Sequence, residues 1–373
     1  MKIGLVCPYH MFKGGGVQEC VLAQYEELTK RGHNVKIITP LPRDYDGPVP
    51  KHFITIGTSA NVRAFFSTQS QFSAAVDTEA IDAMLARENF DLIHFHEPWV
   101  PVLSRQIISR SEAVNVATLH ARLPDRLTAK TLANIFTPYV KAVMRHIDAY
   151  TAVSNAATEH IGAITDSSIT IIPNGINLKK YKNGVIKRSP RKKTILYLGR
   201  LEKRKGVRYL LEAFSVLYQW HSDVNLLIAG SGPEENNLRQ MVEEYDINNV
   251  DFLGYISEEE KLKLLHSVDL LCSPARYGES FGIVLLEAMA SDLPVVAGDN
   301  PGYEAVMQGT GRLSLVDTKA TEDFARRLEL FIYDDKIRKI WLEWSKTYVK
   351  QFDYPLVVDK YEQLYKELVG KHG

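Results

Sequence analysis

The sequence predicts an α/β protein with two doubly wound parallel sheets, one in each half of the chain. Short apolar segments alternate with helical patterns along the first half, and the same alternation starts again after residue 190. Such alternation is typical of parallel sheets that carry helices on both faces. At 373 residues the chain is long enough for two hydrophobic cores of this kind.

The first half begins with the apolar run Lys2–Cys7, which Pro8 ends, and we expect a buried strand there. The apolar residues of Val17–Arg31 recur at helical spacing, and Gly32 suits the end of that helix. Further strands are expected at Val35–Thr39, Asp91–Phe95, Val114–Leu119 and Ala149–Val153.

The second half repeats the pattern, with a strand at Thr194–Leu198 and a helix at Gly206–Trp220. The segment Thr321–Gly373 is helical in pattern and rich in aromatic residues, which we assign to core and interdomain packing. The other strands expected in this half are Val224–Ala229, Val250–Leu253, Val268–Cys272 and Leu293–Ala297.

A basic segment separates the halves. Lys179–Lys193 holds eight basic residues and no acidic one. It is either a solvated linker or a segment drawn to an anionic membrane, where each basic residue contributes ~1 kcal/mol. The expected divisions are residues 1–178, the linker 179–193, residues 194–350 and a C-terminal helix at 351–373. Two such domains commonly bind a ligand in the cleft between them.

Composition excludes several classes of protein. Lys and Arg together number 45, as do Asp and Glu, so the chain is neither a globally basic nucleic-acid binder nor an acidic disordered protein. No apolar run approaches the length of a membrane-spanning helix, and residues 1–12 make a poor signal peptide. The three cysteines are too few and scattered for a disulfide framework, so the cytoplasm is the expected compartment.

The first candidate anion site is the run Gly14–Val17, which follows the first strand and opens a helix. Free N–H groups and the helix dipole favour an anion at that position, and glycine lets a phosphate approach the backbone. The spacing is not that of the dinucleotide fingerprint. The alternative is a flexible turn.

The second candidate is the loop Gly199–Gly206, with the sequence GRLEKRKG, between a strand and a helix. Ligands of open α/β sheets bind outside the carboxyl ends of the strands, where Arg200 lies. Arg200, with a nearby ammonium group, can neutralise a diphosphate leaving group. We expect Lys203 and Arg204 to be solvated. The alternative is a basic surface loop.

The third candidate is the segment Arg276–Ala290, which runs through a glycine-containing loop into a helix. Glu279 in the loop can accept hydrogen bonds from sugar hydroxyls, and Glu287 in the helix can hold a ribose. The N–H groups near Ile283 form a second anion site. The alternative is a capped helix with one surface glutamate.

A metal site is not expected. On a strand, His94 and His96 share one face while Glu97 points to the other, and HExxH is absent. The D-x-D triplet Asp44–Asp46 lies in a loop rich in Pro and Gly and is interpreted as a turn. His120 ends a strand and is a candidate donor of a hydrogen bond to a reacting sugar, or else a structural histidine.

Taken together, these motifs match a known family. GGGV, HFHEPWVP, IIPNGIN, GRLEKRKG, GSGPEE and the pair Glu279 and Glu287 occur in this order. The set resembles the retaining GT-B glycosyltransferases of family four, and within them the bacterial phosphatidylinositol mannosyltransferases. The similarity covers essentially the whole chain.

The resemblance implies two Rossmann-like domains facing a cleft, with the C-terminal helix crossing back to the first domain. It implies a nucleotide-sugar donor, GDP-mannose, with no metal and no other cofactor. Arg200 and Lys205 would stabilise the departing diphosphate, Glu279 would hold the donor sugar, and His120 would lie near that sugar. The other donor-binding residues would be Gly15, Gly16, Ile256, Lys261, Phe281, Gly282, Ile283 and Glu287.

The implied acceptor is an inositol phospholipid or a similar lipid, reached by peripheral contact with anionic membrane at the inner face of the cell membrane. Gln18 and Arg122 are candidate acceptor contacts. One departure concerns Ser59–Val76, where the mannosyltransferases carry a basic amphipathic helix: this chain has Arg63 but no cluster of Lys or Arg. Electrostatic docking there is expected to be weaker, and Arg122, Arg126 and Lys130 are offered as contacts with an acidic headgroup instead.

Three other functions remain open at this point. The first is a retaining transferase that uses a UDP-sugar and another lipid or a soluble acceptor. The others are a nucleotide-sugar-binding subunit without turnover and a GT-B epimerase or phosphorylase. The presence of Arg200, Lys205, Glu279 and His120 argues against a subunit without turnover.

Overall fold

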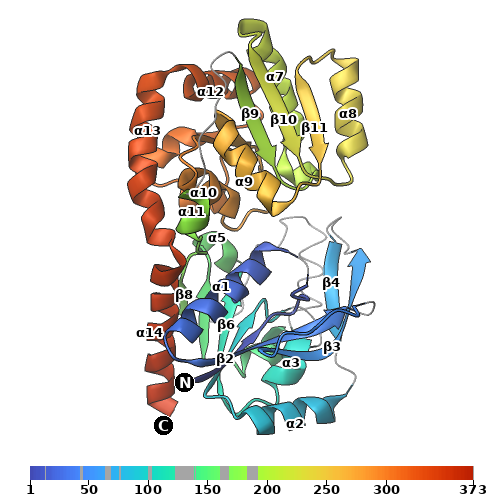
Figure 1. The fold of residues 1–373 in the computed structure, drawn as a ribbon, viewed down its shortest axis with the longest axis vertical. Helices are drawn as coiled ribbons and strands as arrows, with labels where there is room; N and C mark the ends of the chain where they lie inside the picture. Colours follow the sequence, from blue (N-terminus) through green and yellow to red (C-terminus); the bar gives the residue numbers. More distant parts are fainter. Residues whose placement is uncertain are drawn as a thin grey trace. The chain divides into compact units, whose positions relative to one another are not determined.

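The computed structural model describes residues 1–12, 14–42, 45–63, 69–74, 77–99, 103–121, 138, 140–159, 168–182 and 192–372. The chain divides into two compact units, each with its own sheet (Figure 1). The N-terminal unit comprises Met1–Gly175 and Tyr354–Gly373, and the C-terminal unit comprises Ile176–Asp353.

Eight strands form the sheet of the N-terminal unit within the described ranges, in the order β4-β3-β2-β1-β5-β6-β7-β8. Adjacent strands pair in parallel, except that β4 runs antiparallel to β3. The parallel, doubly wound arrangement expected from the sequence is therefore confirmed for this half. The strands are β1 (Lys2–Val6), β2 (Asn34–Pro42), β3 (Phe53–Arg63), β4 (Gln69–Ala74), β5 (Leu92–His96), β6 (Val114–Leu119), β7 (Ala149–Ala152) and β8 (Ile169–Ile171).

Helices pack against this sheet through two clusters of buried apolar residues. One cluster joins β1, β5 and β6 to helix α1 through residues such as Ile3, Val21 and Leu28. The other includes Phe95, Ile81 and Leu103, from β5 and two further helices. The helices described before residue 175 are α1 (Gly16–Lys30), α2 (Thr78–Glu88), α3 (Leu103–Ile108) and α5 (Asn155–Thr158).

Six strands form the sheet of the C-terminal unit in the part of the chain that is described, in the order β11-β10-β9-β12-β13-β14. All of its pairings are parallel, as predicted. The strands are β9 (Lys193–Leu198), β10 (Val224–Ala229), β11 (Val250–Gly254), β12 (Leu270–Ser273), β13 (Val295–Gly298) and β14 (Leu315–Val316). The helices are α6 (Leu178–Lys182), α7 (Val207–Trp220), α8 (Glu235–Glu244), α9 (Glu258–Ser267), α10 (Ile283–Ala290), α11 (Pro301–Val306), α12 (Thr321–Tyr333) and α13 (Asp335–Tyr348), with 3-10 turns at Lys203–Lys205, Gly309–Ser314 and Val349–Phe352.

The structure bears on two segments of the sequence analysis, 179–193 and 59–76. The basic segment 179–193 begins inside α6, and its residues 183–191 are outside the described residues. The region 59–76 contributes the hairpin of β3 and β4, where the related mannosyltransferases were expected to carry a helix. None of the helices in the described residues is long and apolar enough to span a bilayer.

The last helix, α14 (Tyr354–His372), belongs to the N-terminal unit and packs on α1, which confirms that the C-terminal helix returns to the first domain (Figure 1). Its buried residues Val357, Val358, Tyr361 and Tyr365 join the same apolar cluster as β1 and α1. Ion pairs also join α1 to α14 next to this apolar contact. Arg31 at the end of α1 pairs with Asp359 and Glu362 of α14.

Glu362 is the centre of this ion-pair group. It lies 2.6 Å from Lys366, 2.9 Å from Arg31 and 3.0 Å from His33. Its bonds to Lys366, His33 and Arg31 lower the pKa of Glu362 to about 2. A lowered carboxyl pKa stabilises the folded state above the unfolded-state pKa, and that stability is lost as the pH falls toward the folded-state pKa.

We therefore expect Glu362→Gln to lower the free energy of unfolding at pH 7 by ~1 kcal/mol, the value of a networked surface ion pair. The difference from the wild type should shrink as the pH falls from 4.5 toward 2. Urea unfolding at several pH values measures this difference in the free energy of unfolding. Glu367→Gln, on the same helix, is the control. A difference that is constant across this pH range would contradict the assignment.

Candidate active site

Each sheet has a topological switch point, where strands that follow in the sequence are added first on one side of a central strand and then on the other. In the N-terminal unit, β1 lies between β2, which follows it in sequence, and β5, which comes later. In the C-terminal unit, β9 lies between β10 and β12 in the same way. Ligands of open α/β sheets bind outside the carboxyl ends of the strands at such points. The residues that follow β1, β5, β9 and β12 are therefore the candidates in each unit.

In the C-terminal unit, this position holds a buried carboxylate with two cations. Glu279, in the loop after β12, lies 2.6 Å from Arg204 and 2.8 Å from Lys205, which follow β9. The Glu279 side chain is 10% exposed, whereas those of Arg204 and Lys205 are 26% and 20% exposed. The structure thus brings together Lys205 and Glu279, two of the residues predicted to be catalytic.

Arg204 was expected to be solvated, and this expectation is wrong. Its guanidinium bonds the carboxylates of Glu202 and Glu279 and the carbonyl of Gly278. The reason is the 3-10 turn Lys203–Lys205, in which successive side chains point about 120° apart. Lys203 consequently faces solvent while Arg204 turns inward. Nothing in the local sequence distinguishes these two neighbours except the acidic residue Glu202 just before them.

Arg200 lies at the carboxyl end of β9 with its side chain 45% exposed. It pairs with the buried carboxylate of Glu202 at 3.1 Å, and its carbonyl accepts a hydrogen bond from Tyr197 at 2.8 Å. The backbone position of Arg200 is therefore fixed while part of its guanidinium stays open to solvent. A group of this kind can bind an anion without first being ordered.

Two glycines allow the loops after β9 and β12 to pack closely. Gly206 has φ +73°, and a Cβ atom there would lie 2.2 Å from the carbonyl oxygen of Pro274. Gly282 has φ +99°, and a Cβ atom there would lie 2.7 Å from the ring of Tyr303. These glycines immediately precede α7 and α10, whose first N–H groups and dipoles favour an anion.

Glu287 forms a second buried carboxylate group in the C-terminal unit. It lies on α10 and accepts hydrogen bonds from the Tyr181 hydroxyl at 2.8 Å and from Lys261 at 2.6 Å. Lys261 also pairs with Glu258 at 2.9 Å. Burial works against the charge of Lys261, but the carboxylates of Glu287 and Glu258 outweigh it and raise the pKa of Lys261. Lys261 and Glu287, both predicted to bind the donor, are therefore in direct contact.

The remaining predicted donor residues lie close in sequence to these groups. Phe281 is buried and contacts the ring of Phe352, and Gly282 and Ile283 form the start of α10. Ile256 precedes α9, which a capping box at Ser257 begins. Tyr181 was missed because it lies in the segment predicted to be a linker.

In the N-terminal unit, the loop after β1 leads into α1. The helix begins at Gly16 with Gly15 as its N-terminal cap, so the predicted order of strand, glycine loop and helix is confirmed. Gln18 is buried in the first turn, and its amide lies 3.5 Å from the carbonyl of His10. Arg122 lies outside the described residues, as do Arg126, Lys130 and Asp44.

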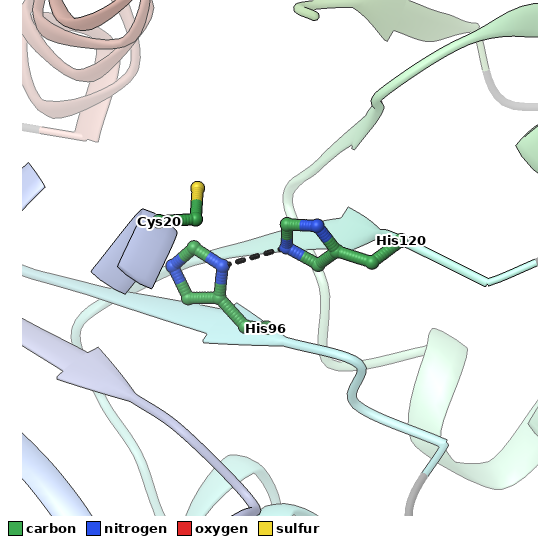
Figure 2. A group of neighbouring side chains, drawn as sticks. All are labelled: Cys20, His96 and His120. Atoms are coloured by element: carbon green, nitrogen blue, oxygen red, sulfur yellow. Dashed lines mark hydrogen bonds between the residues drawn. The ribbon is translucent and has the colours of Figure 1, made fainter. Parts of the chain in front are cut away.

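Three histidines gather at the carboxyl ends of β5 and β6. His94 lies between the Tyr365 hydroxyl and the Thr118 hydroxyl, at 2.6 Å from each. Nδ1 of His96 lies 2.8 Å from Nε2 of His120 (Figure 2). Burial lowers the pKa of His94 to about 3 and that of His120 to about 4. At neutral pH His120 is therefore an uncharged imidazole, with one N–H donor and one acceptor nitrogen.

Glu97 is a residue of this region whose role the sequence did not reveal. It follows β5 with φ +50°, an uncommon conformation for a residue other than glycine and one that recurs at functional sites. Its carboxylate accepts hydrogen bonds from the backbone N–H groups of His120 and Ala121. Burial raises the pKa of Glu97 to about 7, against the effect of these bonds. Glu97 thus fixes the backbone from which His120 projects.

Comparison with known proteins decides the family. Residues 14–180 match the model of Glycosyltransferase Family 4, and residues 181–347 match that of Glycosyl transferases group 1. A phosphatidyl-myo-inositol mannosyltransferase of Mycobacterium leprae is 32% identical over 377 residues, which cover 100% of this chain and 98% of the relative. The chain belongs to glycosyltransferase family 4.

Further relatives agree with this family-4 assignment. The phosphatidyl-myo-inositol mannosyltransferase of Mycolicibacterium smegmatis is 30% identical, covering 99% of this chain and 95% of the relative. The crystal structure of Anabaena HepE in complex with UDP is 18% identical and has a TM-score of 0.78, covering 98% of this chain and 100% of that one. The predicted GT-B fold and the retaining glycosyltransferase class are confirmed.

Proposed function

We propose that this family-4 enzyme transfers mannose from GDP-mannose to an inositol phospholipid or a similar membrane lipid, without a metal ion. The observation that carries this proposal is the full-length similarity, at about 30% identity, to mannosyltransferases named for that acceptor. The cations and carboxylates at the β9–β12 switch point of the C-terminal unit support the chemistry.

In the proposed reaction, the acceptor hydroxyl oxygen forms a bond to the anomeric carbon as the bond from that carbon to the diphosphate oxygen breaks. The hydroxyl proton passes to the departing diphosphate on the same face of the sugar, so configuration is retained. Negative charge builds on the diphosphate. Arg200, Lys205 and the N-termini of α7 and α10 are assigned to stabilise it, and one well-placed donor contributes ~3–4 kcal/mol in comparable systems.

The other residues receive the roles that the resemblance implies. Glu279 holds the sugar, and the contacts of Arg204 and Lys205 fix the orientation of its carboxylate. Glu287 holds the ribose, and Ile256 and Lys261 lie beside the base. The loop at Phe281, Gly282 and Ile283 supplies backbone contacts to the donor. From the N-terminal unit, Gly15 and Gly16 contact the diphosphate, His120 the sugar, and Gln18 and Arg122 the acceptor.

Glu287→Gln should weaken donor binding without slowing the transfer step. Glu287→Gln keeps the shape of the side chain but removes its charge, so its hydrogen bonds to the ribose weaken. We expect the KM for GDP-mannose to rise ~10-fold, which corresponds to a loss of ~1.4 kcal/mol of binding free energy. The turnover number should change little. Steady-state kinetics and GDP titration measure both quantities. Glu258→Gln is the matched control, since Glu258 pairs with the same lysine but is 44% exposed. A fall in turnover at unchanged KM would contradict the ribose assignment.

The lipid acceptor places the enzyme at the cytoplasmic face of the cell membrane. The basic residues of segment 179–193 support an electrostatic contribution to membrane contact. Sedimentation with vesicles of phosphatidylinositol and phosphatidylglycerol should show binding that weakens as salt rises. Vesicles of phosphatidylcholine serve as the control. Absence of binding at low salt favours a soluble acceptor.

The transfer assay tests the proposal as a whole. Radiolabelled GDP-mannose is incubated with phosphatidylinositol vesicles and the enzyme in chelator, and the expected product is a mannosylated lipid. One observation favours a second candidate, a UDP-sugar transferase with another acceptor: segment 59–76 lacks the cluster of basic residues expected of a membrane-docking helix. Transfer from a UDP-sugar and none from GDP-mannose would replace the proposal with that candidate.

A further inference from the structure

A group of side chains able to bind a metal ion lies in the N-terminal unit, and the proposed reaction uses only one of them, His120. Cys20 of α1, His96 of β5 and His120 after β6 each present a donor atom, and these atoms lie within 4.8 Å of one another (Figure 2). Cys20 and His96 are buried, and His120 is partly exposed. No local sequence pattern links Cys20 to the two histidines, because Cys20 lies far from them in the chain.

The fold explains why these three residues meet. Strands β1, β5 and β6 are neighbours in the sheet, so His96 at the end of β5 and His120 just after β6 share its carboxyl edge. Helix α1 starts at the same edge after β1 and presents Cys20 in its second turn. The group therefore rests on rigid elements of one unit, as a ligand set requires.

An unsatisfied buried atom points independently to a ligand. Nε2 of His96 has no hydrogen-bond partner, and the His96 side chain is 0% exposed. Its other nitrogen shares one proton with Nε2 of His120. Whichever ring holds that proton, Nε2 of His96 is left as either a buried N–H without an acceptor or a buried lone pair without a donor. A buried polar atom of this kind destabilises the fold unless something binds it.

The chemistry of the group selects the class of ion. One thiol and two imidazoles suit a borderline-soft divalent cation such as Zn²⁺, whereas Mg²⁺ and Ca²⁺ require oxygen ligands. Zinc sites with three protein ligands leave a fourth position for water or substrate. Bonds of ~2.0 Å to nitrogen and ~2.3 Å to sulfur require the three donors to close on the ion. The thiol binds as a thiolate, so its proton is released to solvent when the ion binds.

We propose that Cys20, His96 and His120 form a binding site for Zn²⁺, and that occupation of this site inhibits the enzyme. The inhibition rests on the proposed function, because it follows from the withdrawal of His120 from the donor sugar. The binding does not rest on it. Metal binding and activity therefore give separate tests.

Cobalt is the probe for the binding test, because Co²⁺ bound to thiolate in a tetrahedral site gives a ligand-to-metal charge-transfer band. The full chain, freed of any histidine tag, is titrated with Co²⁺ under reducing conditions. We expect the band at one ion per chain and its loss when Zn²⁺ is added. Cys20→Ser should remove the band and weaken Zn²⁺ binding at least ~100-fold. Cys272→Ala is the control, since Cys272 is an equally buried free cysteine of the other unit.

The outcomes are distinct. No band, or a band that survives in both Cys20→Ser and Cys20→Ala, overturns the site; a metal-free melting curve for each variant confirms that it is folded. A band that depends on Cys20, with transfer that Zn²⁺ inhibits and a chelator restores, supports the whole proposal. A Cys20-dependent band without inhibition keeps the site but overturns the inhibition and the sugar-binding role of His120. Mg²⁺ at the same concentrations should have no effect.

Discussion

Replacing Arg200 or Lys205 with alanine is expected to remove nearly all sugar transfer and leave the fold intact. Both side chains lie beside the β9–β12 switch point, and both are cations with access to solvent, at 45% and 20% exposure. If each donates to the departing diphosphate, the loss of either raises the barrier by ~3–4 kcal/mol, which corresponds to a fall in turnover of ~100- to 1,000-fold.

The control for this experiment lies in the same turn. Lys203 belongs to the same 3-10 turn as Lys205 but faces solvent, so Lys203→Ala should retain turnover within about 2-fold. The melting temperatures of all three variants should be close to that of the wild type, because Arg200 is exposed and Glu279 keeps Arg204 when Lys205 is removed. Near-normal turnover in both Arg200→Ala and Lys205→Ala would contradict the roles assigned to them.

Removing the charge of Glu279 is expected to impair both stability and catalysis. The Glu279 carboxylate is 10% exposed and pairs with Arg204 and Lys205 at 2.6 and 2.8 Å. Glu279→Gln removes the carboxylate that these two cations share, and Arg204 keeps only its ion pair with Glu202. Loss of one partner of a fully buried pair costs ~3–5 kcal/mol. Because both cations remain partly exposed to water, we expect the free energy of unfolding to fall by ~1–3 kcal/mol.

The catalytic effect of Glu279→Gln should exceed what the loss of stability explains. The amide cannot accept hydrogen bonds from the sugar as strongly as the carboxylate, and Arg204 and Lys205 no longer hold it in place. We expect turnover to fall ~100-fold at a temperature where the variant is fully folded. Glu235→Gln is the control, since Glu235 forms an exposed pair with Arg239. A variant that is destabilised but fully active would show that Glu279 is only structural.

The sequence predicted the central strands of both sheets because these are buried on both faces. Strand β6 coincides with the predicted Val114–Leu119, and β10 with Val224–Ala229. The hairpin of β3 and β4 was not predicted. The last residues of β3, SANVR, and the whole of β4, QSQFSA, are largely polar, and β4 is the edge strand of the sheet. Neither a continuous apolar run nor a turn signal marks these segments as strands.

The candidate site was predictable in part for the same reason. Gly15, Arg200 and Glu279 follow predicted strands, so the strand ends locate them. Arg204 and Lys203 are indistinguishable by residue type, and only the turn decides which one points inward. Tyr365 bonds His94, and Cys20 lies near His96, although each pair is far apart in the chain. Such contacts depend on how the helices pack on the sheet, and no local pattern reports that.

Thermal unfolding of the purified enzyme with GDP, UDP and ADP in a chelating buffer shows which nucleotide the donor site binds. A nucleotide present at about 100 times its dissociation constant should stabilise the protein by ~2.7 kcal/mol. We predict that GDP alone raises the melting temperature, and that Arg200→Ala and Glu287→Gln reduce this shift. A shift with UDP alone would contradict the assignment of GDP-mannose as donor, and with it the proposed mannosyl transfer.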